Sequence, residues 1–545
     1  MSGTAASARG RPSSTAAGGD PSGTAAARGK PRGTAAGGEP SDIAPVLPVS
    51  VLEPLAECVR GHYGSAPVAQ VLGLPGQAAL ARADLLGAER LTQGGSPTET
   101  LIRLFLLGLP VSRPAAAAAL APLPVQAAVG AGLLIADGDQ LLAALDLRPY
   151  SEIDGPDWWL LSDLGADVRP GPLRPDHVLG VGQAATTLAQ ATVREPVRRA
   201  LDVGTGSGVQ ALHLSRHCRS ITATDLSDRA LSFAAANAAL NGQHWQLRQG
   251  SLLDPVAGEL FDLIVCNPPF IVGPGFTAAD SGFSYRDSGL AGDSVCQRLV
   301  AGLPDRLAEH GTGQLLANWI IPADVDWSER VAGWLPPHGV AAWIWQREVA
   351  EPGEYVSLWL RDAGERPGTE RWAIRYRRWQ DWFTEAGAVA VGMGLISIRR
   401  TDRPSEIVCE DVPQAYQSPV APAIADWFDR RRWLADADLL AARLVAAPGL
   451  VLTTRSLLGE AAEPGWQPAL STLGQTGGLR WEIEVDEAVA MLVAACTGEV
   501  ATGAVLSLLA ESAGLPATEV IEALRPVLRD LVERGFLLPN PPAGR

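Results

Sequence analysis

The spacing of apolar residues predicts alternating strands and helices in the middle of the chain. Short aliphatic runs at 199–203, 220–224 and 261–266 are separated by segments of helical length, such as 228–240. Strands that alternate with helices are typical of a parallel sheet covered by helices. With a further α/β unit and a last hairpin ending at 389–400, we predict an α/β fold with a seven-stranded Rossmann-like sheet.

The pattern on both sides of this region is mostly helical. Residues 43–153 predict several helices and a small hairpin that turns at Asp137 and Gly138, which is typical of a winged helix. From residue 404, Ala- and Leu-rich helices end in another helix-turn-helix pattern with a short strand. Because neither region is rich in basic residues, we favour packing or protein contact over DNA reading for both.

These patterns divide the chain into four parts. Residues 1–42 repeat Gly-Thr-Ala-Ala and lack the large apolar side chains of a core, so we predict a disordered tail. The three predicted domains are a helical, winged-helix-like domain at 43–153, the α/β domain at 154–403, and a helical domain at 404–545 that ends in a winged-helix-like unit.

Composition narrows the possible functions. The 545 residues carry a formal net charge of −16, so a nucleic-acid partner requires a local basic patch. The six cysteines include no Cys-x-x-Cys pair, which predicts no metal site and a reducing, cytoplasmic setting. No apolar run is long enough for a membrane span, and the N-terminus lacks a secretory signal, so we expect no membrane association.

A glycine-rich turn follows the first central strand. Gly204, Gly206 and Gly208 stand at alternate positions between that strand and a helix that starts at Val209. Such a turn brings backbone N–H groups and a helix N-terminus to a bound ligand. A dinucleotide site has a third glycine where this chain has Val209, and Asp202 before the turn favours an ammonium or sulfonium ligand over a pyrophosphate.

Polar residues also follow the next three strands, at the edge where open α/β sheets bind ligands. Asp225 ends the second strand, and its carboxylate is suited to accept both hydroxyls of a ribose. Asp254 follows the third strand and is a candidate acceptor for an adenine amino group, and Asn267 follows the fourth. The ordered set predicts a nucleoside site.

The turn Asn267-Pro268-Pro269-Phe270 is suited to activate a planar nitrogen. The lone pair of an amide or a base amine is delocalised, and two acceptors against its N–H bonds free that pair. Asn267 supplies a side-chain oxygen and Pro268 a backbone carbonyl, while the two prolines keep the turn rigid. Phe270 supplies a flat face for stacking. Asn267 is therefore the first candidate catalytic residue, and we expect the neighbouring Cys266 to be a buried thiol.

Residues 199–320 resemble the class I S-adenosylmethionine-dependent methyltransferases, in the branch with Asn-Pro-Pro-Phe or Asn-Pro-Pro-Tyr after the fourth strand. The run from Asp202 to Gly208, with Asn237 and Asn241, is similar to the release-factor glutamine and small ribosomal RNA methyltransferases. The resemblance implies S-adenosyl-L-methionine as cofactor, methyl transfer as activity and a methyltransferase sheet. It implies cofactor contacts at Asp202, Gly204, Thr205, Gly206, Gly208, Asp225, Leu226, Ser251, Leu252 and Asn267, and catalysis at Asn267, Pro268, Pro269 and Phe270.

The sequence defines the acceptor less closely. We predict the amino group of a nucleic-acid base, with RNA favoured over DNA; a protein glutamine, a small-molecule amine and a non-catalytic cofactor-binding scaffold are the alternatives. The basic and aromatic stretch 371–379 is the candidate nucleic-acid contact, and a solvated helix face explains it almost as well. Tyr285 and Arg286, in a Gly- and Ser-rich loop, are candidate substrate contacts by stacking and by pairing with an anion.

Overall fold

The computed structural model describes residues 47–540, except residue 83 and residues 152–154, 166–167, 169–172, 277–288 and 460–464. The predicted tail, residues 1–42, lies outside the described residues, and so do Tyr285 and Arg286. Residues Ile43–Arg545 form one compact unit. Within the described ranges, every helix is too short or too polar to cross a membrane.

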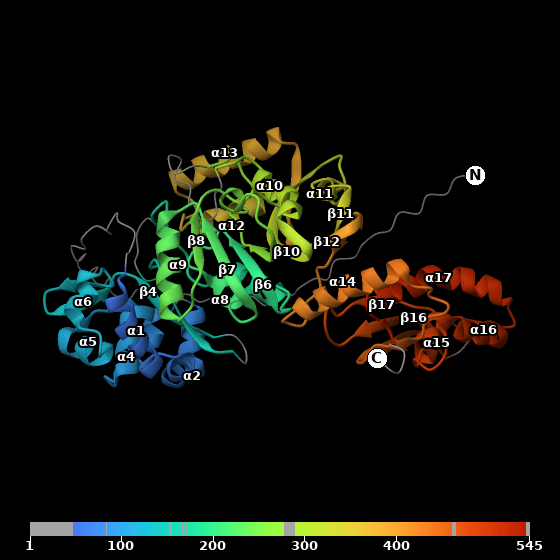
Figure 1. Ribbon diagram of the computed structural model, residues 1–545, viewed down its shortest axis with the longest axis horizontal. Helices are drawn as coiled ribbons and strands as arrows, with labels where there is room; N and C mark the ends of the chain where they lie inside the picture. The colour runs from blue at the N-terminus through green and yellow to red at the C-terminus, as the bar shows by residue number, and fades with distance from the viewer. Residues whose placement is uncertain are drawn as a thin grey trace, which may run out of the picture. The chain divides into compact units, whose positions relative to one another are not determined.

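A mixed sheet of eight strands forms the centre of the described chain, in the order β13-β11-β12-β10-β9-β6-β7-β8 (Figure 1). The neighbouring strands from β8 to β10 are parallel, and β12 is antiparallel to both β10 and β11. The strands are β6 (Val197–Val203), β7 (Cys218–Asp225), β8 (Gln246–Gln249), β9 (Phe261–Cys266), β10 (Leu307–Pro322), β11 (His338–Ala350), β12 (Ala388–Pro404) and β13 (Glu406–Asp411).

The sheet has one strand more than the seven predicted. β13 lies beyond residue 403, the predicted end of the α/β domain, and pairs in parallel with β11. Its six residues include three acids, so the sequence gives little strand periodicity there. The sheet therefore continues to Asp411.

Helices cover both faces of the sheet, as expected for parallel strands that are apolar on both sides. Successive residues of β9 point to opposite faces: Ile264 belongs to one apolar core, and Leu263 and Val265 belong to the other. Helices α10 and α11 contribute to the first core, and α7, α8 and α14 to the second. Their bounds are α7 (Gln183–Ala191), α8 (Val209–Leu214), α10 (Ser294–Gly302), α11 (Trp327–Ala332) and α14 (Ala421–Asp436).

The chain before the sheet forms a helical module that shares a core with the sheet domain. Its small sheet has the order β1-β3-β2, and the predicted hairpin at Asp137 and Gly138 is present. Phe233 and Leu240 of helix α9 (Asp228–Leu240) lie in the same apolar core as Phe105 of the module. The module comprises α1 (Val49–His62), α2 (Ser65–Ala81), α3 (Leu85–Glu89), α4 (Pro97–Leu101), η1 (Ile102–Leu106), β1 (Val111–Ser112), α5 (Arg113–Leu120), α6 (Val125–Gly130), β2 (Leu134–Asp137), β3 (Gln140–Ala143), β4 (Asp146–Ser151) and β5 (Asp157–Ser162).

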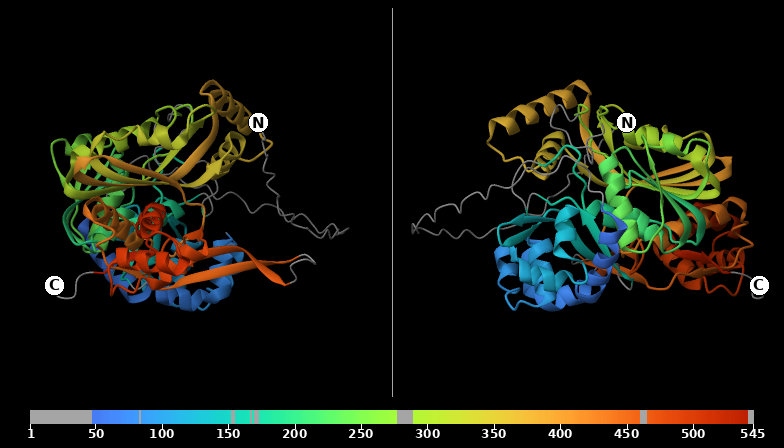
Figure 2. Two further views of the ribbon diagram at one scale, coloured as in Figure 1. Left: turned by 90° about the vertical axis from the view of Figure 1, so that its right-hand side faces the viewer. Right: turned by 60° about the vertical axis from the view of Figure 1, so that its left-hand side comes forward.

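The chain after Asp411 contains more strand than predicted. Strands β15 (Leu450–Leu458) and β16 (Trp466–Gln475) form an extended antiparallel arm (Figure 2). Most residues of the arm are exposed, so its sequence lacks the alternation of a half-buried strand. The expected terminal strand is present as β18, paired with β14. The remaining elements are β14 (Leu444–Ala446), β17 (Glu482–Glu484), α15 (Glu487–Ala495), α16 (Thr502–Ala513), α17 (Ala517–Glu533) and β18 (Leu537–Pro539).

Candidate active site

A cavity of about 520 Å³ opens at the carboxyl ends of β6, β7 and β9. This volume is within the range of pockets that bind small molecules and cofactors, about 300–1,000 Å³. Polar residues from the three strands meet there, because the carboxyl ends of parallel strands share one edge of the sheet. The predicted site residues that line the cavity are Gly204, Thr205, Gly206, Asp225, Leu226, Ser251, Leu252, Asn267, Pro268 and Pro269.

The three glycines of the glycine-rich turn have two different structural roles. Gly204 and Gly206 line the cavity with φ angles of +70° and +55°, a region in which a side chain is strained. Gly208 lies outside the lining, and a β-carbon there would stand 2.6 Å from the Trp245 ring. Gly208 is therefore required for packing at the start of α8, while the other two give the turn its shape against the cavity.

Asp202 stands behind the glycine turn instead of lining the cavity. Its carboxylate accepts hydrogen bonds from the Thr205 hydroxyl at 2.7 Å and from the Ala211 backbone N–H at 3.2 Å. The side chain is buried, and burial raises the pKa of Asp202 to about 7. Asp202 therefore supports the turn and α8. The sequence predicted a cofactor contact for this residue, but it stands behind the residues that line the cavity.

Asp225 connects the first two strands at the cavity. One carboxylate oxygen accepts a hydrogen bond from the Gly206 backbone N–H at 2.9 Å, and the other accepts one from the Ser227 N–H at 2.9 Å. Burial raises the pKa of this carboxyl above its ordinary value. Each oxygen keeps a further lone pair, so Asp225 holds the turn in place and still has capacity for ligand hydroxyls.

Asn267 presents an unsatisfied acceptor at the cavity wall. Its side-chain Oδ1 is buried and has no hydrogen-bond partner among the described residues. Pro268 and Pro269 also line the cavity, and Phe270 lies outside it, with its ring 6.1 Å from the Trp359 ring in an edge-on contact. The turn therefore has an unpartnered oxygen acceptor on a residue of the cavity wall, while Phe270 packs beside it.

Two helices between β11 and β12 clamp the chain that follows this turn. Helices α12 (Pro352–Asp362) and α13 (Glu370–Glu385) share an apolar core with Val272. The Tyr355 hydroxyl accepts hydrogen bonds from the Val272 N–H and the Asn318 side chain, both at 2.9 Å, and Trp379 donates to the Val272 carbonyl at 3.0 Å. Both polar groups of the Val272 backbone are thus fixed by buried side chains.

The same clamp uses part of the stretch 371–379. Arg375 is buried, pairs with Glu365 and lies over the Phe276 ring, and Trp379 is fully buried. These two side chains are committed to internal packing and do not reach a nucleic acid. Arg371 and Arg377 on the same helix are exposed. The predicted basic-aromatic stretch is therefore partly core and partly surface.

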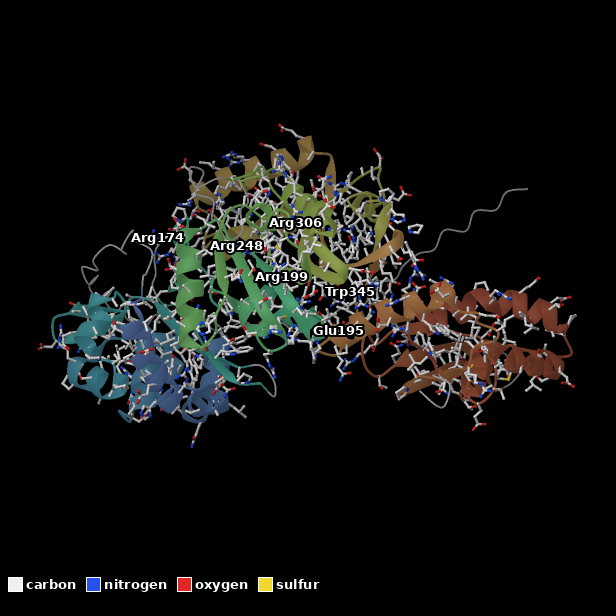
Figure 3. The ribbon with its side chains drawn as sticks, in the orientation of Figure 1. Arg174, Glu195, Arg199, Arg248, Arg306 and Trp345 are labelled. Atoms are coloured by element: carbon white, nitrogen blue, oxygen red, sulfur yellow. The ribbon has the colours of Figure 1, made fainter. Side chains whose placement is uncertain are left out.

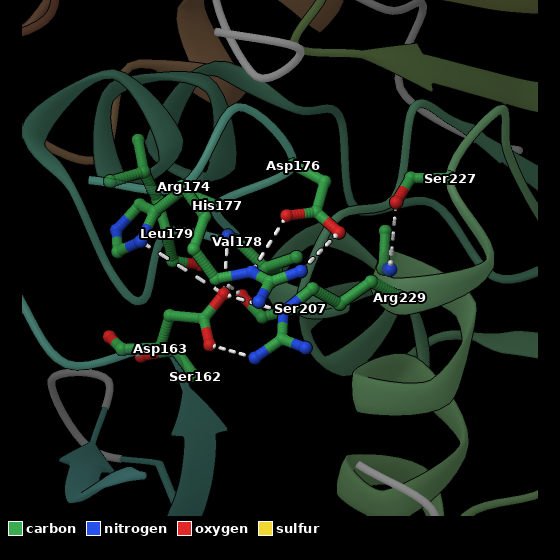
Figure 4. Close-up of polar contacts among 11 residues, drawn as sticks. Ser162, Asp163, Arg174, Asp176, His177, Val178, Leu179, Ser207, Ser227 and Arg229 are labelled. Carbon is green, nitrogen blue, oxygen red and sulfur yellow. Dashed lines mark hydrogen bonds and ion pairs between the residues drawn. The ribbon is translucent and has the colours of Figure 1, made fainter. Parts of the chain in front are cut away.

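Beside the cavity lies a buried ionic cluster that the sequence did not reveal. Asp163, directly after β5, forms a charge pair with Arg229 of α9, and His177 lies beside it with Nδ1 3.9 Å from the carboxylate (Figure 4). His177 lines the cavity, and burial lowers the pKa of its ring. Asp163 and Arg229 are 66 residues apart in sequence, and no local motif joins them.

Other predicted residues have simpler outcomes. Asp254 starts the short helix η2 (Asp254–Val256) and does not line the cavity, where Ser251 and Leu252 stand instead. Cys266 is buried, and burial raises the pKa of its thiol well above the ordinary value, as expected for an inert cysteine. In the part of the chain that the structure describes, His, Cys, Asp and Glu form no group of three arranged to hold a metal ion.

Three protein families match parts of the chain. The methyltransferase small domain matches residues 180–280, which contain both the glycine turn and the Asn267 turn. Two families described as domains of unknown function match residues 60–144 and 425–539.

Curated relatives that match the central region include two glutamine methyltransferases. The release factor glutamine methyltransferase of Xylella fastidiosa is 40% identical over 130 residues, which are 22% of this chain and 47% of the relative. The ribosomal protein uL3 glutamine methyltransferase of Bradyrhizobium diazoefficiens is 32% identical over 151 residues, 26% of this chain and 46% of the relative. The chain thus spans about half the length of the curated relatives it matches.

Solved structures of methyltransferases also match. A ribosomal protein L11 methylase from Lactobacillus delbrueckii is 30% identical, with a TM-score of 0.18, over 24% of this chain and 57% of the other. A 16S rRNA N2 methyltransferase from T. thermophilus, in complex with AdoMet and guanosine, is 19% identical with a TM-score of 0.25, over 46% of this chain and 63% of the other.

Proposed function

We propose that this class I S-adenosylmethionine-dependent methyltransferase transfers a methyl group from its cofactor to a planar nitrogen. The acceptor that we propose is the side-chain amide nitrogen of a protein glutamine. The class and the cofactor follow from the match to the methyltransferase small domain, in agreement with the sequence prediction. The acceptor is supported by relatives whose names specify glutamine methylation. The amino group of a nucleic-acid base, the first prediction from the sequence, becomes the second candidate.

The observation that carries this proposal is that Asn267 lines the cavity and that its buried Oδ1 has no partner among the described residues. Leaving such an acceptor unsatisfied is costly, so its persistence at a cavity points to a ligand donor. An amide N–H of the acceptor fits this oxygen. Pro268 follows without an N–H of its own, so no neighbouring donor competes.

The residues at the cavity fit a nucleoside cofactor. Besides Asn267, Thr224 lines the cavity, and its buried hydroxyl oxygen has no partner among the described residues. Gly204 and Gly206 let a ligand approach the backbone closely, and Asp225 has acceptor capacity for ribose hydroxyls. When bound, S-adenosylmethionine supplies an electrophilic methyl group on a good leaving group.

The work of this chain is then to position the acceptor nitrogen. Asn267 accepts one N–H of the amide, which draws the nitrogen toward tetrahedral geometry and frees its lone pair for attack. The clamp of Tyr355 and Trp379 on Val272 keeps the turn from shifting. Catalysis arises from orientation and from placed dipoles, and the amide proton leaves to solvent after transfer.

Charge distribution favours a protein acceptor over a nucleic acid. The formal net charge of the chain is −16, and Arg375 is buried in an ion pair. Arg199 of β6 and Arg248 of β8, both labelled in Figure 3, share Glu259 as their ion-pair partner, so one of their two positive charges is balanced within the sheet domain. Arg371 and Arg377 are exposed, and exposed arginines are suited to contact phosphates. They are the feature that supports the nucleic-acid candidate.

Labelling separates the two candidates. The full-length protein is incubated with methyl-labelled S-adenosylmethionine and with bacterial protein, RNA and DNA fractions, each freed of the others by nuclease or protease. We expect label in the protein fraction, in N5-methylglutamine after complete proteolysis, and a much lower initial rate of labelling with Asn267→Ala. Label in a base amine of RNA or DNA would select the second candidate. Label on carbon or oxygen would contradict the planar-nitrogen proposal itself.

A further inference from the structure

The strongest unexplained feature near the cavity is the buried charge pair between Asp163 and Arg229. The exposed fractions of these two residues are 8% and 7%. The Nε of Arg229 donates to one carboxylate oxygen at 2.9 Å, and a terminal nitrogen of the guanidinium donates to the other, so the pair is bidentate (Figure 4). Buried ion pairs contribute little net stability compared with apolar packing. The fixed geometry of this pair is therefore a better guide to its role than its contribution to stability.

The pair is fastened to one segment of backbone, residues 176–182. Asp163 exchanges two hydrogen bonds with Val178: its carboxylate accepts from the Val178 N–H at 2.9 Å, and its own N–H donates to the Val178 carbonyl at 3.1 Å. The next residue, Leu179, accepts a hydrogen bond from the Ser207 hydroxyl of the glycine turn at 2.7 Å. The segment is thus held on one side by the charge pair and on the other by the turn.

This segment forms a wall of the cofactor cavity. Asp176, His177, Val178, Leu179, Gly180 and Gly182 all line the cavity. The Val178 side chain belongs to the core of the N-terminal module. A displacement of Val178 would therefore change the shape of the cavity on one side and open the core on the other.

Helix α9 joins the charge pair to the N-terminal module through a second set of contacts. The Asn241 side chain exchanges hydrogen bonds with the N–H and carbonyl of Trp159 at 2.9 and 2.8 Å. The Asn237 side chain does the same with Leu161 at 2.7 and 2.9 Å, and also donates to the Ser207 carbonyl at 2.8 Å. Two amides one helical turn apart thus bind alternate residues of β5, the strand that ends just before Asp163.

We propose that Asp163 and Arg229 are positioning residues that hold residues 176–182 as a wall of the cofactor cavity, so that the N-terminal module sets the affinity for the cofactor. This inference rests on the proposed function only in taking the cavity as the S-adenosylmethionine site. Neither side chain contacts the reacting atoms. The two residues act through the backbone of Val178 and Leu179. Replacing them should therefore change the affinity for the cofactor more than the rate of methyl transfer.

Calorimetry on the full-length protein tests the proposal, with S-adenosylmethionine and S-adenosylhomocysteine as probes. Arg229→Met and Asp163→Asn each remove one partner, and Arg229→Lys keeps the charge but loses the bidentate geometry. Arg219→Met, at an exposed arginine of β7, is the matched control. We expect Kd to rise at least tenfold for the first two variants, by a smaller factor for Arg229→Lys, and by less than twofold for the control.

Two further measurements separate positioning from general loss of structure. Hydrogen exchange should accelerate in a peptide covering 176–182 and stay unchanged in one covering β9. With an active acceptor, KM for the cofactor should rise while kcat at saturating cofactor stays within twofold. Unchanged Kd in a folded Arg229→Met or Arg229→Lys protein overturns the inference. Absence of cofactor binding by the wild-type protein overturns the proposed function instead, so the two failures are distinct.

Discussion

The carboxylate of Asp202 accepts a hydrogen bond from the hydroxyl of Thr205 at 2.7 Å, across the base of the glycine turn. Both side chains are buried, so this bond is one of the few polar contacts that Asp202 has in place of water. The last residue but one of β6 is therefore held inside the turn that it precedes. The stability of that turn should depend on pH.

The first prediction concerns the free energy of unfolding as a function of pH. Burial raises the pKa of Asp202 from 3.8 to about 7, so between these values the folded protein holds a proton that the unfolded chain has released. Stability from this group is full below the unfolded pKa and is lost as pH rises through the folded one, by at most about 4 kcal/mol. Denaturant unfolding of Asp202→Asn should show a smaller decrease between pH 5 and pH 8 than wild type. Equal decreases in the free energy of unfolding of the wild-type and Asp202→Asn proteins would show that Asp202 does not cause this pH dependence.

A second prediction concerns the partner of that carboxylate. Thr205→Val removes the hydroxyl and leaves Asp202 with fewer donors, which should lower stability by about 1–2 kcal/mol at pH 8. The loss should be smaller at pH 5, where Asp202 is protonated. Thr205→Ser keeps the hydroxyl and is the matched control. A pH-independent loss in Thr205→Val would show that the hydroxyl stabilises the turn independently of the charge on Asp202.

A third prediction concerns the acceptor oxygen of Asn267. Asn267→Ala should lower kcat by a factor of about 10² or more, as loss of a preorganised catalytic contact does in other enzymes. The Kd for the cofactor should change little by comparison. Rapid-quench methyl transfer and calorimetry measure the two quantities, with Gln297→Ala, at an exposed residue of α10, as control. Full activity in Asn267→Ala would remove the mechanism proposed for this turn.

A fourth prediction concerns the clamp on the acceptor turn. Tyr355→Phe leaves the Val272 N–H and the Asn318 side chain without their shared acceptor, which should cost about 1–3 kcal/mol of stability. Because Val272 follows the turn, KM for the acceptor should rise while cofactor affinity is retained. Tyr416→Phe, outside this core, is the control for loss of a tyrosine hydroxyl. If only the affinity for the cofactor changed, the clamp would act on cofactor binding and not on acceptor binding, which would contradict this prediction.

A fifth prediction concerns the exposed arginines of α13. If the acceptor is a protein glutamine, Arg371→Glu with Arg377→Glu should leave methyl transfer to the protein fraction within twofold. If the acceptor is a nucleic acid, the same double variant should weaken binding and reduce its dependence on salt. Fluorescence binding at two salt concentrations distinguishes these results.

The central strands were predictable from sequence because their signals are local. Aliphatic runs such as 261–266 end in polar residues, and the glycine spacing limits what binds at the turn. These features need no knowledge of distant residues. The acidic edge strand β13 and the exposed arm of β15 and β16 lack that periodicity, so the sequence did not indicate them.

The site was predictable only where its residues follow the strands. Asp163 and Arg229 meet across 66 residues and belong to no motif, so only the fold brings them together. The inward direction of Arg375 and Trp379 did have a sequence signal. Trp379 and Phe383 stand four residues apart on one helical face, which indicates that this face is packed, and Arg375 stands four residues before Trp379 on the same face.

The contribution of α9 to the core of the N-terminal module has a consequence for the order in which the protein is made. Val178 and the α9 residues Phe233 and Leu240 complete the apolar core of the N-terminal module. Synthesis proceeds from the N-terminus at about 5–20 residues per second, so the roughly 60 residues from Val178 to Leu240 take several seconds to appear. During that interval the nascent module has left the ribosome with its core still open. It can close only when the helix that begins beside the cofactor cavity has emerged.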